Sequence, residues 1–330
     1  MRIKKPIKFF LLGVLLVVVI VFVWLFVYQP SQAAKISWGV DFSQKHSQNL
    51  GLNWQETYLA FLEDLSAKNL KINTAWDLLE PQKDKYQFAD LDWQINQAQS
   101  HQAKILLVIG MKTPRWPECH LPDWVKTLSK QEQQEEILGL LQTIVLRYQQ
   151  NQTIWAWQVE NEPFLSFGKC PWRDDSFFKK EVALVKSLDS RPVIVSSSGE
   201  WSAWFKEASL ADVVGTTLYR QVWMGWLNRS LPYYFGPEFY RLKSDIIEKI
   251  FGKKVICVEL QAEPWGKKLI YDVPVAEQLK LFDHNQFLKN IDFAKSTGLD
   301  TFYLWGGEWW YWFKEKQGDD YFWQTAKSLF

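Results

Sequence analysis

The stretch WQVENEPF, residues Trp157 to Phe164, joins an apolar run to a polar end. Apolar and aromatic residues lead into Glu160, Asn161 and Glu162, and the next residue is Pro163, which has no N–H to continue a strand ladder. The pattern predicts a buried strand whose carboxyl end presents a carboxylate beside an amide. Such an acid either takes part in chemistry or is a structural strand-end residue.

Short apolar runs alternate with amphipathic segments about eight times along the chain. Besides the stretch above, the expected strands cover residues 36–42, 70–76, 104–110, 192–197, 213–219, 255–259 and 301–305. Apolar strands separated by helices indicate a parallel sheet covered on both faces, and eight such units in about 295 residues predict a (β/α)8 TIM barrel. A doubly wound sheet is the alternative, but GVDFSQKHSQNLG after the first strand is a poor phosphate-binding turn.

Four of the first eight residues are cationic, and an apolar run over residues 9–28 follows them. Twenty helical residues span about 30 Å, the hydrocarbon thickness of a bilayer. We therefore expect a short cytoplasmic basic segment (1–8), a single transmembrane signal anchor (9–28), a linker (29–35) and an extracytoplasmic barrel (36–330). A signal peptide cleaved near Ala34 is the alternative, and the barrel would then be secreted.

Composition narrows the class of ligand. The 38 Lys and Arg residues nearly balance 37 Asp and Glu residues, so there is no basic field for a nucleic acid. The chain has 20 Trp, 22 Phe and 12 Tyr residues, and aromatic rings can stack against sugars as well as fill a core. Four scattered His residues and no CxxC pattern predict neither a metal site nor a cofactor, and no oligomeric state is indicated.

A barrel builds its active site from residues at the carboxyl ends of the strands. Strands four and seven lie across the barrel from each other, so Glu162 and Glu259 are expected to face each other. In glycosidic-bond cleavage one carboxyl group protonates the leaving oxygen and the other stabilises or traps the oxocarbenium-like centre, with retention of configuration when they are about 5 to 5.5 Å apart. Glu263, in the loop after strand seven, is the alternative to Glu259. The other polar and aromatic residues at these ends are Asp41, Trp76, Asp77, Lys112, Asn161, Ser198, Glu200, Tyr219, Gln261, Trp305 and Glu308.

Asn161-Glu162-Pro163 and KVICVELQAEPW, which contains Glu259, resemble the two catalytic motifs of clan A glycoside hydrolases, a group of (β/α)8 barrels. The segment WDLLEPQKDKYQF to MKTPRWP, residues 76–117, is similar to cellulase-like and family 42 and 35 β-galactosidase-like enzymes. The resemblance implies that Glu162 is the acid/base, that Glu259 is the nucleophile and that Asn161 binds the sugar hydroxyl next to the reacting carbon.

The same resemblance implies that Tyr219 hydrogen-bonds the nucleophile and that Trp305 forms the floor of the subsite beside the scissile bond. Trp76 joins them as an expected substrate contact. Clan members commonly supply an Arg near the end of strand two or a His after strand three, and KINTAWD has no Arg. Lys112 is therefore predicted as a substitute donor near the substrate.

The function predicted from these residues is retaining hydrolysis of a β-linked oligo- or polysaccharide by double displacement. The alternative is a catalytically inactive, membrane-anchored barrel that binds carbohydrate. Cys119 and Cys170 lie in the loops after strands three and four, and we predict a disulfide between them, with two unpaired thiols as the alternative. If strand four is regular, Glu160 should point to the same side as Glu162.

Overall fold

The computed structural model describes residues 5–26 and 33–330. The first helix, α1, covers Lys5–Phe26. Within these two ranges, no helix was found that is long and apolar enough to cross a membrane. The expected anchor over residues 9–28 thus stays a prediction, and those parts of the expected basic segment, anchor and linker that fall in 1–4 and 27–32 lie outside the described residues.

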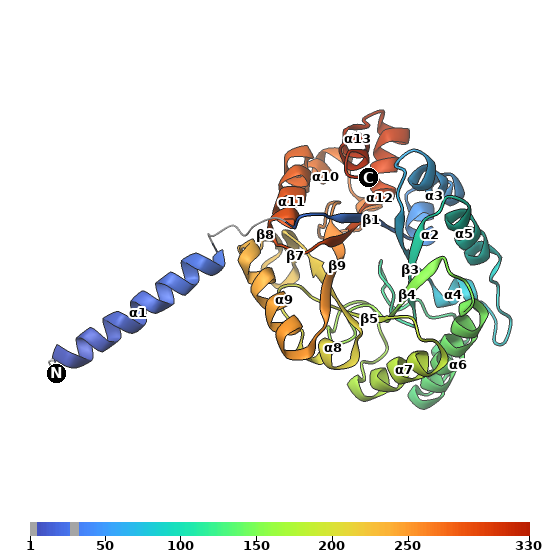
Figure 1. The fold of residues 1–330 in the computed structure, drawn as a ribbon. Coiled ribbons are helices and arrows are strands. Elements are labelled where there is room, and N and C mark those ends of the chain that lie inside the picture. Colours follow the sequence, from blue (N-terminus) through green and yellow to red (C-terminus); the bar gives the residue numbers. More distant parts are fainter. Residues whose placement is uncertain (1–4, 27–32) are drawn as a thin grey trace.

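Eight parallel strands close into a barrel, as the sequence predicts (Figure 1). In order around the barrel they are β1 (Ser37–Phe42), β10 (Thr301–Trp305), β9 (Lys254–Gln261), β6 (Val213–Leu218), β5 (Val193–Ser197), β4 (Ile154–Val159), β3 (Lys104–Ile109) and β2 (Asn69–Asn73). An antiparallel hairpin that the sequence did not predict, β7 (Gln221–Met224) and β8 (Arg229–Pro232), follows β6.

Helices surround the strands in Figure 1. They are α2 (Gln44–Asn49), α3 (Trp54–Glu63), α4 (Trp76–Leu79), α5 (Ala89–Ser100), α6 (Lys130–Tyr148), α7 (Asp175–Leu188), α8 (Phe205–Leu210), α9 (Pro237–Phe251), α10 (Val275–Leu281), α11 (His284–Ser296), α12 (Gly307–Trp312) and α13 (Tyr321–Lys327). Two helices, α10 and α11, lie between β9 and β10 because the Asp283 side chain accepts the Gln286 N–H and caps a new helix after α10.

The barrel interior has an apolar layer below a polar one. The inner apolar cluster is separate from the larger core between strands and helices and consists of Leu106, Ala156, Ile194, Ile256, Val258 and Tyr303. Because side chains on a strand alternate between its two faces, residues two positions further along the strands also point inward. On β4 and β5 these positions hold Gln158 and Ser196, which are hydrogen-bonded to each other. The polar layer therefore lies at the carboxyl end of the barrel, above an apolar base.

Candidate active site

A bulge in β9 directs Glu259 into the barrel mouth. Between the pairs Thr216 with Cys257 and Thr217 with Glu259, β6 advances by one residue while β9 advances by two. Val258 belongs to the inner cluster, so a regular strand would turn the next residue outward. An extra residue re-aims the side chain that follows it, and bulges are common beside active sites for this reason.

Glu259 is held by one cation and one phenol. Lys71 Nζ donates to Glu259 Oε1 over 3.0 Å, and Tyr219 Oη donates to Oε2 over 2.8 Å. All three side chains are buried. The hydrogen bond from Tyr219 that the family resemblance implies is therefore present, and it comes from the residue after β6.

Lys71 is a functional residue that sequence reasoning missed. On β2 it also donates to Asp41 Oδ2 over 2.9 Å, and Asn73 Nδ2 donates to Asp41 Oδ1 over 2.8 Å. Burial by itself would lower the pKa of Lys71, but the carboxylates of Asp41 and Glu259 outweigh burial and raise it. Lys71 thus supplies the positive charge beside Glu259, a role for which an Arg or Lys112 was expected. The available signal was the alternation of polar Lys71 and Asn73 with apolar Leu70 and Ile72.

Glu162 lies in a different environment from Glu259. It follows β4 with a positive φ of 43°, its N–H donates to Ser196 Oγ over 2.8 Å, and Thr217 Oγ1 donates to its Oε1 over 3.3 Å. Burial, followed by the negative charge of Glu259, raises the pKa of Glu162 to about 8. Around neutral pH this carboxyl group therefore holds a proton.

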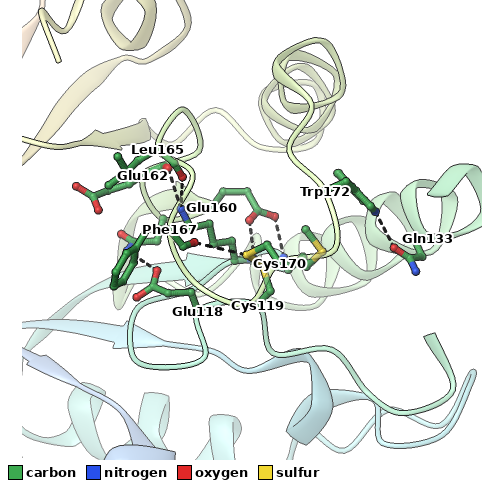
Figure 2. The surroundings of a disulfide bond; sticks show 12 residues. Glu118, Cys119, Gln133, Glu160, Glu162, Leu165, Phe167, Cys170 and Trp172 are labelled. Carbon is green, nitrogen blue, oxygen red and sulfur yellow. Dashed lines mark hydrogen bonds between the residues drawn. A yellow bond between two sulfur atoms is a disulfide. The ribbon is translucent and has the colours of Figure 1, made fainter. Parts of the chain in front are cut away.

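Glu160 does not share the direction of Glu162, so the expectation of a common side was wrong. The strand ends at Val159, and Glu160 has a φ of 57°. Its two oxygens accept the N–H groups of Met111 (2.7 Å) and Lys112 (2.6 Å), which ties β4 to the loop after β3. Figure 2 shows Glu160 and Glu162 pointing in different directions. Glu160 is thus a structural acid two residues before the acid of the mouth.

Lys112 is bound to backbone rather than to Glu259. Its Nζ donates to the carbonyl oxygens of Glu162 (3.0 Å) and Leu165 (2.9 Å). Asn161 lies beside it in the mouth, where its Nδ2 donates to Glu118 Oε2 over 3.2 Å. Burial raises the pKa of Glu118 to about 8. Glu118 is therefore a third carboxyl group close to the pair, and its loop position gave no signal in the sequence.

A buried ionic cluster forms another wall of the mouth. Arg115 binds Glu263 and, over 2.9 Å, Glu308, and its guanidinium carbon lies 4.0 Å from the centre of the Trp305 ring. Burial by itself would raise the pKa of Glu263, but Arg115 and His46 together outweigh burial and lower it. Glu263 is thus ion-paired to Arg115, whereas Glu259 is ion-paired to Lys71 and also accepts a hydrogen bond from Tyr219.

Aromatic side chains cover the mouth above Glu259. The Tyr219 ring packs against Trp265 (centroids 4.9 Å apart) and Trp305 (5.7 Å). Trp265, in the loop after β9, in turn meets Phe167 of the loop after β4 at 5.7 Å. Trp76, by contrast, is fully buried, and its Nε1 donates to Glu80 over 2.8 Å. A substrate contact by Trp76 stays a prediction.

The predicted disulfide is present. Cys119 and Cys170 are bonded, with their Cα atoms 5.1 Å apart, and they join the loops after β3 and β4 (Figure 2). Beside it, Trp172 Nε1 donates to Gln133 on α6 over 2.7 Å. Cys257 is buried and free. The bond fixes Glu118, its neighbour in sequence, to the loop that begins after Glu162.

Comparison with known proteins gives one family match and several structural ones. Residues 32–182, just under half of the chain, match the model of the family described as Glycosyl hydrolase family 10. Xylanase 10B from Thermotoga petrophila RKU-1, solved in complex with xylobiose, is similar with a TM-score of 0.57 and 16% identity, over 82% of this chain and 82% of that chain.

Two further structures show the range of proteins with this fold. A glycosylated endo-β-1,4-xylanase from Gloeophyllum trabeum has a TM-score of 0.54 and 15% identity, over 85% of this chain and 87% of that chain. The β-galactosidase from Halorubrum lacusprofundi has a TM-score of 0.55 and 14% identity, over 82% of this chain and 52% of that chain. At these identities the similarity is one of fold.

Proposed function

We propose that this glycoside hydrolase, a clan A barrel whose residues 32–182 match family 10, cleaves β-linked glycans with Glu162 as acid/base and Glu259 as nucleophile. The family match agrees with the resemblance expected from the sequence and supports retaining chemistry with two catalytic Glu residues. The observation that carries the assignment of roles is the contrast between the two carboxyl groups. Lys71 and Tyr219 bind Glu259, whereas burial and the charge of Glu259 keep a proton on Glu162.

In the first step, a Glu259 oxygen bonds to the anomeric carbon while the bond to the leaving oxygen breaks. The Glu162 proton moves to that oxygen, so the leaving group departs as a neutral alcohol. The ammonium of Lys71 and the hydroxyl of Tyr219 each donate to one oxygen of Glu259 and hold its carboxyl group in position before the bond forms. In the second step Glu162, now a carboxylate, takes a proton from water as that water displaces Glu259 from the sugar.

The substrate class we propose is a β-linked oligo- or polysaccharide. A panel separates the sugars: the 4-nitrophenyl β-glycosides of xylose, galactose and glucose, each with the matching β-1,4-linked trisaccharide and polymer. Glu162→Gln is the control on every substrate. Turnover of at least one glycoside that is lost in the variant supports the proposal, and proton NMR of the first product should show retention of the β configuration.

A barrel that binds glycan without cleaving it is the competing function. Glu118, close to the pair, and the aromatic rings around Tyr219 would suit a sugar-binding cleft as well. The panel decides between the two. Measurable binding of a trisaccharide with no turnover of any glycoside would favour the binding barrel.

We also propose that the barrel acts outside the cytoplasm. The basic segment and apolar run at the start of the sequence support export, and the Cys119–Cys170 bond suits an oxidising compartment. The test is a fusion of residues 1–40 to alkaline phosphatase, which is active only after export, followed by fractionation of the full chain. Active phosphatase supports export, and recovery of the full chain in the membrane fraction supports an uncleaved anchor. An inactive fusion would contradict the proposal.

A further inference from the structure

Two pairs of loops stand on opposite sides of the barrel mouth. The loops after β3 and β4 are joined by the disulfide, and they pack so closely that a Cβ atom on Gly168 would lie 2.5 Å from Glu118 Cβ. The loops after β9 and β10 are also in close contact, because a Cβ atom on Gly306 would lie 2.6 Å from the Ala262 carbonyl oxygen. Close-packed loops of this kind have little room to move relative to each other.

Arg115 joins the two pairs of loops across the barrel. In the closed ring of eight strands, β3 and β9 are four places apart and so lie opposite each other. From the loop after β3, the Arg115 guanidinium binds Glu263 after β9 and, over 2.9 Å, Glu308 at the start of α12. All three residues are at most 6% exposed. An arginine between two buried carboxylates is held firmly, because moving it away would leave buried charges unpaired.

Aromatic rings make a second contact between the two pairs of loops. The ring of Phe167, in the loop after β4, lies 5.7 Å from that of Trp265, in the loop after β9. It also lies 6.3 Å from the ring of Trp116, which is next to Arg115 in the sequence. We call the ion pairs of Arg115 and the contact between Phe167 and Trp265 together the mouth bridge.

The mouth bridge lies against the residues that hold the proposed nucleophile. Tyr219, the phenol that donates to Glu259, packs against Trp265 and Trp305 with ring centres 4.9 and 5.7 Å apart. The guanidinium carbon of Arg115 lies 4.0 Å from the centre of the Trp305 ring. One face of Trp305 is thus covered by a cation and is closed to a sugar ring. Glu259 itself is only 3% exposed.

The mouth is open on the side of Glu162. A cavity of about 310 Å³ has Glu162 among its lining residues, and none of the residues of the mouth bridge lines it. In retaining hydrolysis the nucleophile attacks the anomeric carbon of the sugar on the non-reducing side of the cleaved bond. The mouth bridge therefore restricts the non-reducing side of a bound chain, whereas the leaving group has an open path.

We propose that the mouth bridge makes this protein an exo-acting hydrolase, with room for a single sugar on the non-reducing side of the scissile bond. The substrate is then the non-reducing end of a β-linked chain, and each turnover releases one monosaccharide. The inference rests on the proposed function, because it requires that Glu259 attack the anomeric carbon of the terminal sugar. Arg115 and Phe167 determine specificity in this proposal and take no part in bond cleavage.

The test identifies the first products from a β-1,4-linked hexasaccharide of the sugar that the wild type turns over in the panel. The hexasaccharide carries a fluorescent tag at its reducing end, and chromatography at low conversion separates the tagged products. Exo action gives free monosaccharide and a tagged pentasaccharide, which is the result we expect. Tagged di- or trisaccharides as first products would overturn the inference and leave the proposed function intact.

Two variants test the part of the mouth bridge. Phe167→Ala removes a ring that is 37% exposed, so the fold should tolerate the change while the aromatic contact is lost. Arg115→Lys keeps a cation for Glu263 and Glu308 but lacks the planar fork that binds both at once. Each variant should shift part of the first products from the tagged pentasaccharide to tagged tetra- and trisaccharides.

Arg147→Lys on α6 is the matched control. Arg147 also binds a carboxylate and packs on an aromatic ring, but it lies outside the mouth, so this variant should give the products of the wild type. Tagged pentasaccharide alone from both bridge variants would overturn the mouth bridge as the determinant, and Phe167→Ala decides if Arg115→Lys does not fold. Failure of the wild type to turn over any panel substrate would instead overturn the proposed function and this inference with it.

Discussion

The two sides of the barrel mouth surround two glutamate side chains, Glu259 and Glu162, with different neighbours. On the β9 side, Glu259 accepts hydrogen bonds from an ammonium and a phenol. On the β4 side, the Glu162 carboxyl group accepts a 3.3 Å hydrogen bond from the Thr217 hydroxyl, and burial raises its pKa to about 8. The neighbours of a strand-end acid, and not its place at the strand end, therefore determine whether it is suited to act as a nucleophile or as an acid.

Removing the carboxylate on the β9 side should have the largest effect. Glu259→Gln should lower kcat by about 10⁴-fold or more, because no atom is left to form the covalent intermediate. The matched control is Glu263→Gln, which breaks an ion pair with Arg115 and should cost at most about 100-fold. Steady-state kinetics on the best panel substrate would measure both losses. If Glu263→Gln abolished turnover while Glu259→Gln kept it, the roles would be assigned to the wrong residues.

Replacing Lys71 should make the surroundings of Glu259 more like those of Glu162. Lys71→Met should lower kcat/KM by about 10² to 10³-fold, the range for loss of one preorganised electrostatic contact. Without the ammonium, the 3.0 Å hydrogen bond to Glu259 Oε1 is lost, so the proposed nucleophile is less firmly positioned. Lys71→Arg should restore part of the lost kcat/KM, because it returns a cationic donor. Steady-state kinetics on the best panel substrate would measure both variants, and an unchanged kcat/KM in Lys71→Met would contradict a role for Lys71 at the nucleophile.

The disulfide should matter more for stability than for chemistry. Cys119→Ser combined with Cys170→Ser should lower the free energy of unfolding by about 2 to 4 kcal/mol, the usual value for a native bridge. Activity should fall less than 10-fold, because neither cysteine touches a proposed reacting group. Urea denaturation and kinetics would measure the two effects, with Cys257→Ala as a control. A thiol assay on the denatured, unreduced wild type should count one free thiol, and a count of three would rule out the bridge.

The buried carboxyl groups of Glu118 and Glu160 should make the free energy of unfolding depend on pH. Burial raises the pKa of Glu118 to about 8 and that of Glu160 to about 7, so the folded protein binds protons that the unfolded chain has released. Where the folded state holds more protons, stability falls as pH rises, here between about pH 4.5 and 8. Glu118→Gln should flatten this decline by up to about 1.4 kcal/mol per pH unit. Thermal melts of the wild type and of Glu118→Gln at pH 5, 6, 7 and 8 would test this prediction. An equal decline of stability with pH in the two proteins would contradict the raised pKa of Glu118.

The barrel could be predicted from sequence because its signals are local and repeated. Eight apolar runs at regular spacing and the strand-end pair Glu162 and Glu259 require only periodicity and a fold-level rule. The Cys119–Cys170 bond followed from the neighbouring positions of two loops. These predictions stay correct even when the predicted ends of the strands and helices are off by a few residues.

The partners of the site depend on details that periodicity does not contain. Val258 is one extra residue in β9, and without its bulge Glu259 would face outward. The positive φ of Glu160 turns that acid away from Glu162, and Arg115 and Glu118 occupy positive-φ positions in a loop. The position of Lys71 could have been predicted from the sequence, because a Lys and an Asn that alternate with apolar residues in a strand indicate a polar interior face.

The opposite treatment of the two carboxyl groups is tested most directly by the leaving-group dependence of Glu162→Ala. The measurement is kcat/KM for a 4-nitrophenyl glycoside and for an alkyl glycoside of the same sugar, in the variant and the wild type. Nitrophenolate leaves without a proton, whereas an alkoxide needs one, so the loss should be about 10² to 10⁴-fold larger for the alkyl glycoside. Equal losses on both substrates would contradict an acid/base role for Glu162.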